Sequence, residues 1–143
     1  MLRCGKTAQT AIVAASLLAE RFDGGRTRLS SEDVAKARKI PKPLAAKVLS
    51  TLSTAGLLSG TRGPGGGYWL ARPPARISLA EICSCFEKEA EGLLCPFGPG
   101  WCGTGAPCPM HDAIVQMSHQ WEHYLRDTTL AVFVGRKSAP SKK

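Results

Sequence analysis

The sequence lacks several features that would assign it to common functional classes. It contains no apolar run approaching the roughly 18 residues that a membrane-spanning helix needs, which argues against an integral membrane protein. It also has no Cys-x-x-Cys motif, no phosphate-binding loop and no catalytic carboxylate pair. These absences disfavour an enzyme, including one that uses paired thiols for redox chemistry.

Acidic residues are scarce in the first half of the chain. Residues 1–82 hold 13 Lys and Arg but only 5 Asp and Glu, whereas residues 83–143 hold 6 of each kind. The whole net charge of +8 therefore belongs to the first half. This distribution is typical of a polyanion-binding region followed by a neutral assembly region. The alternative is an ordinary solvated basic surface.

Six cysteines in a chain of 143 residues would form a disulfide framework if the protein were secreted. The apolar run 11–19 follows two basic residues and could pass for the core of a signal peptide. However, Ser16 interrupts this run, no clean cleavage site follows, and the segment fits one face of a helix. We therefore expect a cytoplasmic protein with reduced thiols.

Three cysteines and one histidine fall within seventeen residues, in a loop whose Pro and Gly forbid helix and strand. They are Cys95, Cys102, Cys108 and His111. Such a loop buries no core of its own, so metal ligation is the physical candidate for holding it. The residues fit an iron-sulfur cluster, 2Fe-2S first and 4Fe-4S second, and a tetrahedral zinc site equally well. A third hypothesis is that the cysteines bind no metal and sense redox state directly through their thiols.

The other cysteines and histidines are weaker metal ligands. Cys83 and Cys85 lie two apart in a predicted helix and face different ways, so we expect them, and Cys4, to be small buried residues. His119 and His123 lie one helical turn apart, but no cysteine or acid is placed to complete a site. We expect these two to face solvent or a dimer partner.

Local signals predict a helix-turn-helix in the basic half. A first helix covers about residues 7–22. Ser30 followed by Asp33 is a capping box that opens a second helix. Pro43 suits a first helical position, so a third helix is predicted over 43–55. Two short helices joined by a tight basic turn make the helix-turn-helix.

A β-hairpin should follow the third helix. Two short strands, 57–61 and 68–71, flank a glycine-rich loop that permits a tight turn, and a basic hairpin in this place is a wing. Residues 72–76 read as an extended linker. Ser78 and Glu81 then form a second capping box, which opens a helix through about residue 89.

Pro109 opens the longest predicted helix, which runs to about residue 127 and precedes a short helix over 128–134. Its apolar residues recur at the spacing of a core face. Because the domain is complete without this helix, we favour a partner helix across a two-fold dimer axis. The recurring residues are Ile114, Met117, Trp121, Tyr124, Leu125 and Thr128.

The expected fold is mainly α with a small β-hairpin. Residues 1–82 form a winged helix-turn-helix DNA-binding domain, residues 83–134 hold the cysteine loop and the dimerisation helices, and residues 135–143 form a disordered basic tail. The cysteine loop lies between the basic half and the long helix, so a bound group could change how the two are held. That placement indicates a sensor.

Five short segments carry a specific combination of spacings. They are Ile40-Pro, Ala55-Gly-Leu-Leu58, Arg62-Gly-Pro-Gly-Gly-Gly-Tyr68, Leu70-Ala-Arg-Pro73 and Ile77-Ser-Leu-x-Glu-Ile82. Together they resemble the bacterial winged-helix regulators typified by IscR and NsrR, over about residues 10–134. The resemblance implies a homodimeric DNA-binding transcription factor, usually a repressor, whose three cysteines hold an iron-sulfur cluster. Such proteins respond to cluster supply, nitric oxide or redox state.

The chain departs from that family in three places. Six residues separate Cys95 from Cys102, where the family more often has five, and a Gly- and Pro-rich loop absorbs one extra residue easily. The first acid is Glu20, too late to be an N-terminal fourth ligand, whereas Cys108-x-x-His111 matches the branch that uses histidine. Ala46 is too short to reach a base edge, so the operator sequence cannot be borrowed from a relative. With the resemblance, we favour the cluster over zinc.

The resemblance also implies how the protein meets double-stranded DNA. The third helix would enter the major groove, and Arg62 would reach into the minor groove, where the negative potential is strongest. Loss of the cluster would free the loop and shift the long helix. The third helices of the two protomers would then no longer match half-sites about 34–36 Å apart. The predicted DNA-contacting residues are Arg38, Lys39, Lys42, Pro43, Lys47, Ser50, Arg62, Gly65, Gly66 and Arg72.

Overall fold

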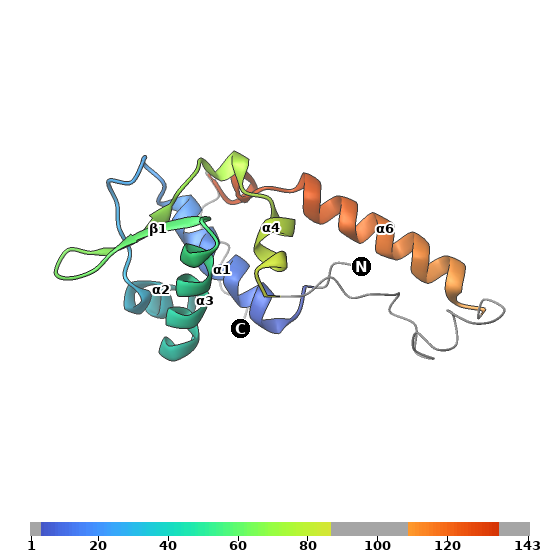
Figure 1. Ribbon diagram of the computed structural model, residues 1–143, viewed down its shortest axis with the longest axis horizontal. Helices are drawn as coiled ribbons and strands as arrows, with labels where there is room; N and C mark the ends of the chain where they lie inside the picture. Colours follow the sequence, from blue (N-terminus) through green and yellow to red (C-terminus); the bar gives the residue numbers. More distant parts are fainter. Residues whose placement is uncertain (1–3, 87–108, 135–143) are drawn as a thin grey trace.

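The computed structural model describes residues 4–86 and 109–134, and it confirms the predicted fold class. Three helices form one group, a two-stranded hairpin projects from it, and the longest helix extends away on the other side (Figure 1). The elements in chain order are α1 Lys6–Glu20, α2 Ser31–Arg38, α3 Lys42–Thr54, β1 Leu58–Thr61, β2 Gly67–Leu70, η1 Pro74–Arg76, α4 Leu79–Ser84, α6 His111–Asp127 and η2 Leu130–Phe133.

Two helices begin at the capping boxes that the sequence predicts. At α2, the Asp33 amide donates to the Ser30 hydroxyl at 3.1 Å, and the Ser30 amide donates to the Asp33 carboxylate at 3.0 Å. At α4, the same reciprocal bonds join Ser78 and Glu81 at 3.2 and 2.9 Å. Each box satisfies backbone donors that a helix start would otherwise leave without a partner.

Small side chains on α1 allow the helices to approach closely in the core. Ala11 and Ala14 of α1 are fully buried, and so are Leu49 and Leu52 of α3. The same core cluster includes residues from β2, from η1 to α4, and from the end of α6 to η2. These are Leu70, Ile77, Leu79, Ala80, Ile82, Cys83, Leu125 and Leu130.

The hairpin is an antiparallel pair with a third strand segment beside it. Gly60 pairs with Tyr68 across the hairpin. On the other side of β2, Leu29 exchanges both backbone hydrogen bonds with Tyr68, at 2.7 and 3.1 Å. A Cβ on Gly67 would lie 2.8 Å from the Leu29 backbone, so glycine permits this close approach. The sequence analysis did not anticipate the Leu29 bridge.

Several predicted boundaries differ from the structure. The third helix begins at Lys42, one residue before Pro43, because the first helical positions need no amide partner and proline is tolerated at the second. The predicted extended linker 72–76 is wrong in part, since η1 occupies Pro74–Arg76. Proline fixes φ near the value that a 3₁₀ turn needs.

The helix predicted to reach about residue 89 ends at Ser84 in the structure. The amides of Cys85 and Phe86 bond carbonyls three residues back, which tightens the turn and stops the α-helix. The last short helix is a 3₁₀ helix, η2. None of the helices in the described ranges combines the length and apolarity needed to cross a membrane.

Candidate DNA-binding surface and metal ligands

Helix α3 presents one apolar face to the core and one polar face to solvent. Ala45, Val48 and Leu49 are fully buried, whereas Lys47 and Ser50 are exposed together with Pro43 and Ala46. Lys39 ends α2 in the left-handed conformation, at φ 55°, and so turns the chain sharply into α3. The structure therefore places Pro43, Lys47 and Ser50 on one accessible helix face.

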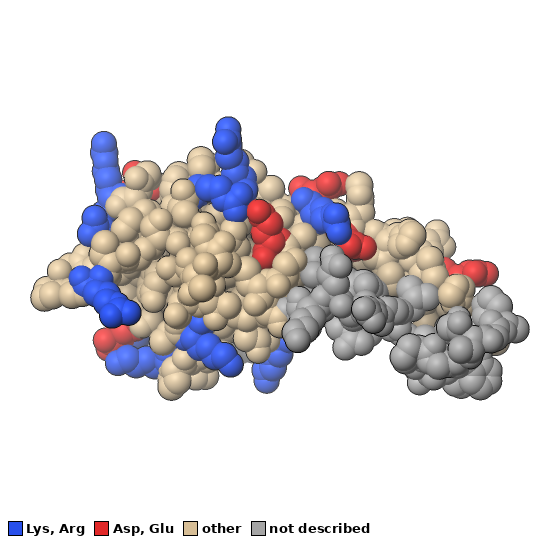
Figure 2. All heavy atoms as spheres, viewed as in Figure 1, with Lys and Arg blue, Asp and Glu red and all other residues tan. Residues whose placement is uncertain are grey.

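Basic side chains are spread around the part of the molecule that holds α1 to α4 and the hairpin (Figure 2). Among the predicted DNA-contacting residues, Lys39, Lys42, Lys47 and Arg62 are exposed. Lys42 lies 3.8 Å from the Glu32 carboxylate, and both side chains are open to solvent, so the pair holds Lys42 only weakly. This part of the molecule can therefore offer several cations to a polyanion.

Two predicted DNA-contacting arginines have partners inside the fold. The Arg38 guanidinium lies 2.9 Å from Glu20 Oε1 and donates to the Ser16 hydroxyl at 3.1 Å. Arg72 lies 3.1 Å from Glu81 Oε1, in the second capping box. These pairings give both side chains a structural role that the sequence did not indicate, and their DNA contacts stay predictions.

The wing loop depends on glycines at defined places. Gly63 and Gly65 have φ of 93° and 75°, a region that other residues rarely adopt. Gly66 donates to the Gly63 carbonyl at 2.9 Å, and a Cβ on Gly66 would collide with the Thr61 carbonyl oxygen. The tight loop leaves the Arg62 side chain exposed beside it.

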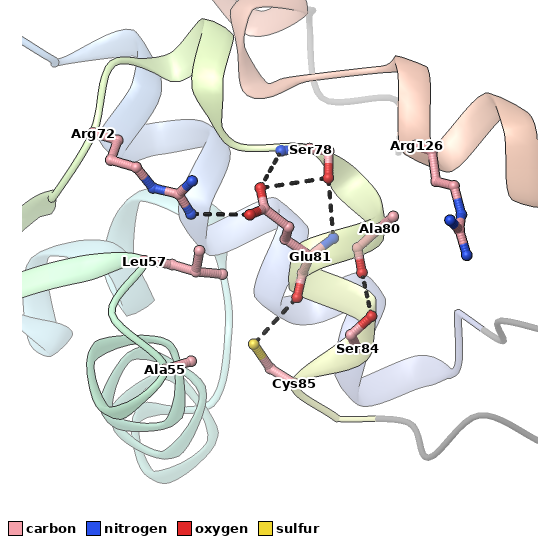
Figure 3. A pocket seen from close by; sticks show the side chains of 9 residues that line it. All are labelled: Ala55, Leu57, Arg72, Ser78, Ala80, Glu81, Ser84, Cys85 and Arg126. Carbon is pink, nitrogen blue, oxygen red and sulfur yellow. Dashed lines mark hydrogen bonds and ion pairs between the residues drawn. The ribbon is translucent and has the colours of Figure 1, made fainter.

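A pocket of about 520 Å³ opens between the end of α3, α4 and α6 (Figure 3). Arg72, Glu81 and Ser78 form one hydrogen-bonded chain along it. Burial alone would raise the pKa of Glu81, but hydrogen bonds from Ser78 and Arg72 outweigh it and hold that pKa below its usual 4.5. The lining residues are Ala55, Leu57, Arg72, Ser78, Ala80, Glu81, Ser84, Cys85 and Arg126.

Cys85 in this pocket is poorly suited to thiol chemistry. Its Sγ bonds the Glu81 carbonyl at 3.2 Å. Burial, and then the charge of Glu81, raise the pKa of the Cys85 thiol above 9.0. A thiol that stays protonated is a weak nucleophile and a weak metal ligand. Cys83 is fully buried, as predicted for a small core residue.

Of the four predicted metal ligands, only His111 lies in the part of the chain that the structure describes. Cys95, Cys102 and Cys108 fall outside it. His111 is the first residue of α6, and its Nδ1 is buried without a hydrogen-bond partner. A buried polar atom without a partner is costly, and a metal ion would satisfy it. Three thiolates and an imidazole form a donor set that suits a cluster or zinc, so the residues fit such a group.

No other group of three or more ligating side chains occurs within residues 4–86 and 109–134. His119 is exposed, and His123 lies 2.7 Å from the exposed Asp127. Both positions agree with the expectation that these histidines face solvent. His111 therefore differs from the other two histidines, which are exposed, in having a buried ring nitrogen.

Helix α6 divides its apolar residues between two faces. Ile114 and Leu125 are buried, and Leu125 belongs to the core cluster. Met117, Trp121 and Tyr124 are 60%, 41% and 53% exposed, and the rings of the last two stack with centroids 5.8 Å apart. We call Met117, Trp121 and Tyr124 the apolar stripe. An exposed apolar surface of this kind is typical of an interface.

Arg28 is a basic residue of this region that the sequence analysis missed. It is exposed and lies over the ring of Trp69 in β2. The alternation of Arg26, Thr27, Arg28 and Leu29 could have indicated a short strand with Arg28 on its outer face.

Comparisons with known proteins agree with this geometry. The model of the Rrf2 family, described as an iron-dependent transcriptional regulator, matches residues 5–136. An HTH-type transcriptional regulator of Aquifex aeolicus (strain VF5) is 31% identical over 87% of this chain and 85% of that protein. The HTH-type transcriptional regulator IscR of Escherichia coli O139:H28 is 29% identical over 93% of this chain and 78% of that protein.

Solved structures share the fold. The structure titled T. potens IscR has a TM-score of 0.69 and 23% identity, and the match covers 91% of this chain and 84% of that one. The structure titled CymR, the global cysteine regulator of B. subtilis, has a TM-score of 0.70 and 21% identity, with 91% and 94% covered.

Proposed function

Because this chain belongs to the Rrf2 family of DNA-binding transcriptional regulators, we propose that it is a homodimeric repressor controlled by an iron-sulfur cluster. Its relatives are named transcriptional regulators and not enzymes. Its proposed partner is double-stranded DNA, so we propose that the protein acts in the cytoplasm. Cys95, Cys102, Cys108 and His111 are the proposed ligands, with 2Fe-2S as first choice and 4Fe-4S as second.

The observation that carries the proposed cluster is the buried Nδ1 of His111, which has no hydrogen-bond partner in the described structure. This buried nitrogen distinguishes His111 from the other two histidines. His111 lies where the cysteine-rich loop joins the start of α6. A bound cluster would supply a centre that responds to oxidation state or nitric oxide.

The far end of α6 is joined to the segment that follows the wing. The Leu79 amide donates to the Thr128 carbonyl at 2.9 Å, and the Leu130 amide donates to the Ile77 carbonyl at 3.0 Å. Leu125, in the last turn of α6, is buried in the core. A movement of α6 would therefore act directly on the junction between the wing and α4, which supports a sensing role for the ligands at its start.

The proposed DNA contacts follow from the accessible basic surface. Helix α3 would enter the major groove through Pro43, Lys47 and Ser50. Arg62 would enter the minor groove, with Gly65 and Gly66 allowing the wing a close approach. Lys39 and Lys42 would contact phosphates beside α3.

The apolar stripe on α6 supports the proposed homodimer. Two copies related by a two-fold axis would bury their stripes against each other and present two α3 helices to successive major grooves. The pairing would also remove the exposed Trp121 and Met117 from water.

Anaerobic purification tests the cluster. We expect visible absorption together with iron and sulfide in stoichiometric amounts in the wild type. His111→Ala should lose most of this, whereas His119→Ala, which changes an exposed histidine on the same helix, should keep it. A colourless protein with one zinc per chain would contradict the proposal.

Promoter binding tests the control of repression. Footprinting on the DNA upstream of the protein's own gene should give an operator for the wild type under oxygen-free conditions. A variant with Ser at Cys95, Cys102 and Cys108 should bind this DNA with altered affinity. Equal affinity of the two proteins at every site would contradict regulation by the cluster.

The alternative function is a zinc-bound or cluster-free winged-helix protein, including one that senses redox state through its thiols. One structural neighbour is titled the oxidized form of Staphylococcus aureus CymR, with 20% identity. A thiol sensor here would have to use cysteines other than Cys85, since the pKa of that thiol is raised. Oxidant-dependent DNA binding by protein that holds no iron would favour this alternative.

A further inference from the structure

Arg28 is held against the wing by two contacts. Its guanidinium carbon lies 4.9 Å from the centroid of the Trp69 ring, and its Nη1 donates to Thr61 Oγ1 at 3.4 Å. The residue belongs to the segment between α1 and α2, and its side chain is exposed. Arg28 thus joins the wing in space although 33 residues separate it from Thr61.

The backbone of this segment fixes where Arg28 lies. The bridge between Leu29 and Tyr68 sets Leu29 beside β2. Side chains alternate along a strand, so Arg28 comes to the face of the hairpin that carries Trp69 and Thr61. This face is the outer one, because Leu70, on the opposite face, is buried.

The platform under Arg28 is itself supported. A Cβ on Gly25 would lie 3.0 Å from Trp69 Nε1, which shows that the indole packs tightly against the backbone of the same segment. Gly25 has φ 98°, so a larger residue there would be both strained and crowded. The segment that carries Arg28 therefore also holds Trp69 in place.

Arg28 keeps its charge available. Arg38, Arg72 and Arg126 each pair with a carboxylate, but within the described ranges no Asp or Glu lies at ion-pair distance from Arg28. An aromatic face attracts the cation without neutralising it and leaves other N–H donors open to a ligand. Thr61, the hydrogen-bond acceptor, is the direct neighbour of Arg62.

We propose that Arg28 is a second DNA-contacting arginine of the wing, which Trp69 and Thr61 hold ready for a phosphate beside the groove that Arg62 enters. A minor groove is only about 6 Å wide, so phosphates border any side chain inserted into it. An arginine stacked at the wing base loses less conformational entropy on binding than a free one. The inference rests on the proposed DNA contact of Arg62.

Salt dependence tests this role, because each neutralised phosphate contributes about 0.9 to the slope of log K against log [salt]. The probe is a mixed-sequence DNA duplex long enough for two successive major grooves. Arg28→Gln should weaken binding on the order of three- to tenfold and lower the slope by about 0.9 per Arg28 bound. Arg28→Lys should restore the slope. Trp69→Leu should weaken binding but keep the slope, since the charge remains.

Arg76→Gln is the matched control, because it removes one exposed arginine from η1 and should leave the slope unchanged. Arg62→Gln tests the proposed wing contact separately and should also lower the slope. An unchanged slope for Arg28→Gln, with a lowered slope for Arg62→Gln, would overturn the role of Arg28 alone. Unchanged slopes for both variants would overturn the proposed wing contact and with it this inference.

Discussion

Arg38 at the end of α2 forms an ion pair with Glu20 at the end of α1, with 2.9 Å between Nη2 and Oε1. Both side chains are about one-fifth exposed, and the same guanidinium reaches Ser16 Oγ and the Val13 carbonyl. The first helix of the helix-turn-helix, α2, is thereby attached to α1. Arg38, which the sequence predicts to contact DNA, therefore also connects two helices.

We expect Arg38→Met to lower the free energy of unfolding by about 1–3 kcal/mol, because the mostly buried Glu20 carboxylate would lose its ion-pair partner and Ser16 would keep only its bond to the Val13 carbonyl. Denaturant titration followed by circular dichroism measures the change. Lys36→Met is the matched control on the same helix. Its pair with Glu32 is exposed, so its loss should cost less than about 0.5 kcal/mol.

The salt slope of DNA binding then separates the two roles of Arg38. If the side chain only holds α2 to α1, Arg38→Met keeps the wild-type slope under conditions where the variant is fully folded. A slope lower by about 0.9 per Arg38, with unchanged stability, would instead establish a phosphate contact.

Acid should weaken the junction at α4. The pKa of Glu81 lies below its usual 4.5 in the folded protein, so its ionised form contributes stability above that pH. This contribution is lost as the pH falls through the folded-state pKa. We expect Glu81→Gln to be less stable near neutral pH and to show a shallower loss of stability below about pH 4.5.

Ser78→Ala is a graded comparison for Glu81. It removes the hydroxyl that caps α4 and should cost about 1 kcal/mol, while the Ser78 amide and Arg72 still bond the carboxylate. Its acid dependence should therefore lie between those of wild type and Glu81→Gln. Identical acid dependence in all three proteins would contradict the assigned role of Glu81.

Two neighbouring glycines in the wing should respond differently to alanine. A Cβ on Gly66 collides with the Thr61 carbonyl, so Gly66→Ala must distort the hairpin and should reduce DNA affinity about as much as Arg62→Gln. A Cβ on Gly65 meets nothing within 4 Å in the free protein, so Gly65→Ala should cost roughly 1 kcal/mol of stability for its positive φ, and any larger loss of DNA affinity would come from the approach of the wing to DNA. Fluorescence anisotropy with labelled DNA and thermal unfolding measure both effects. Wild-type affinity and melting temperature for Gly66→Ala would show that the loop does not need this glycine.

A charge in the apolar stripe should separate the proposed homodimer. Trp121→Glu would place an unpaired carboxylate in the interface, so we expect sedimentation to shift from dimer to monomer and DNA affinity to fall at the same time. Gln116→Glu adds the same charge at an exposed position on another side of α6 and should leave the dimer intact. A wild type that sediments as a monomer at all concentrations would rule out this interface.

Much of the fold could be predicted from short-range patterns. The Ser30 and Ser78 capping boxes each need only a residue three positions away, so the sequence placed both helix starts correctly. The apolar spacing in α3 likewise indicated its buried face, since one helix period decides it. The end of α4 was missed because the residues that stop it, Cys85 and Phe86, carry no standard breaker signal.

The functional surface was harder to predict residue by residue. Lys47 and Arg62 are exposed as expected, but Arg38 and Arg72 turned out to have carboxylate partners. Arg28 was overlooked because the alternation around it indicates at most a short strand, and nothing local shows that this strand pairs with the wing. Composition gives the number of cations in a region, but it does not show which of them form ion pairs with carboxylates in the folded protein.

The sequence by itself determined the local elements and the ligating residue types, through caps, glycines and a thiol-rich loop that act over a few positions. The tertiary structure alone decided which of the predicted arginines pair with carboxylates and which described histidine has a buried ring nitrogen without a partner. The physical reason is range. A capping hydrogen bond is set within one helical turn, whereas Arg38 meets Ser16 across 22 residues and Arg28 meets Thr61 across 33. Such distant partners meet only once the helices and the wing have packed around a common core.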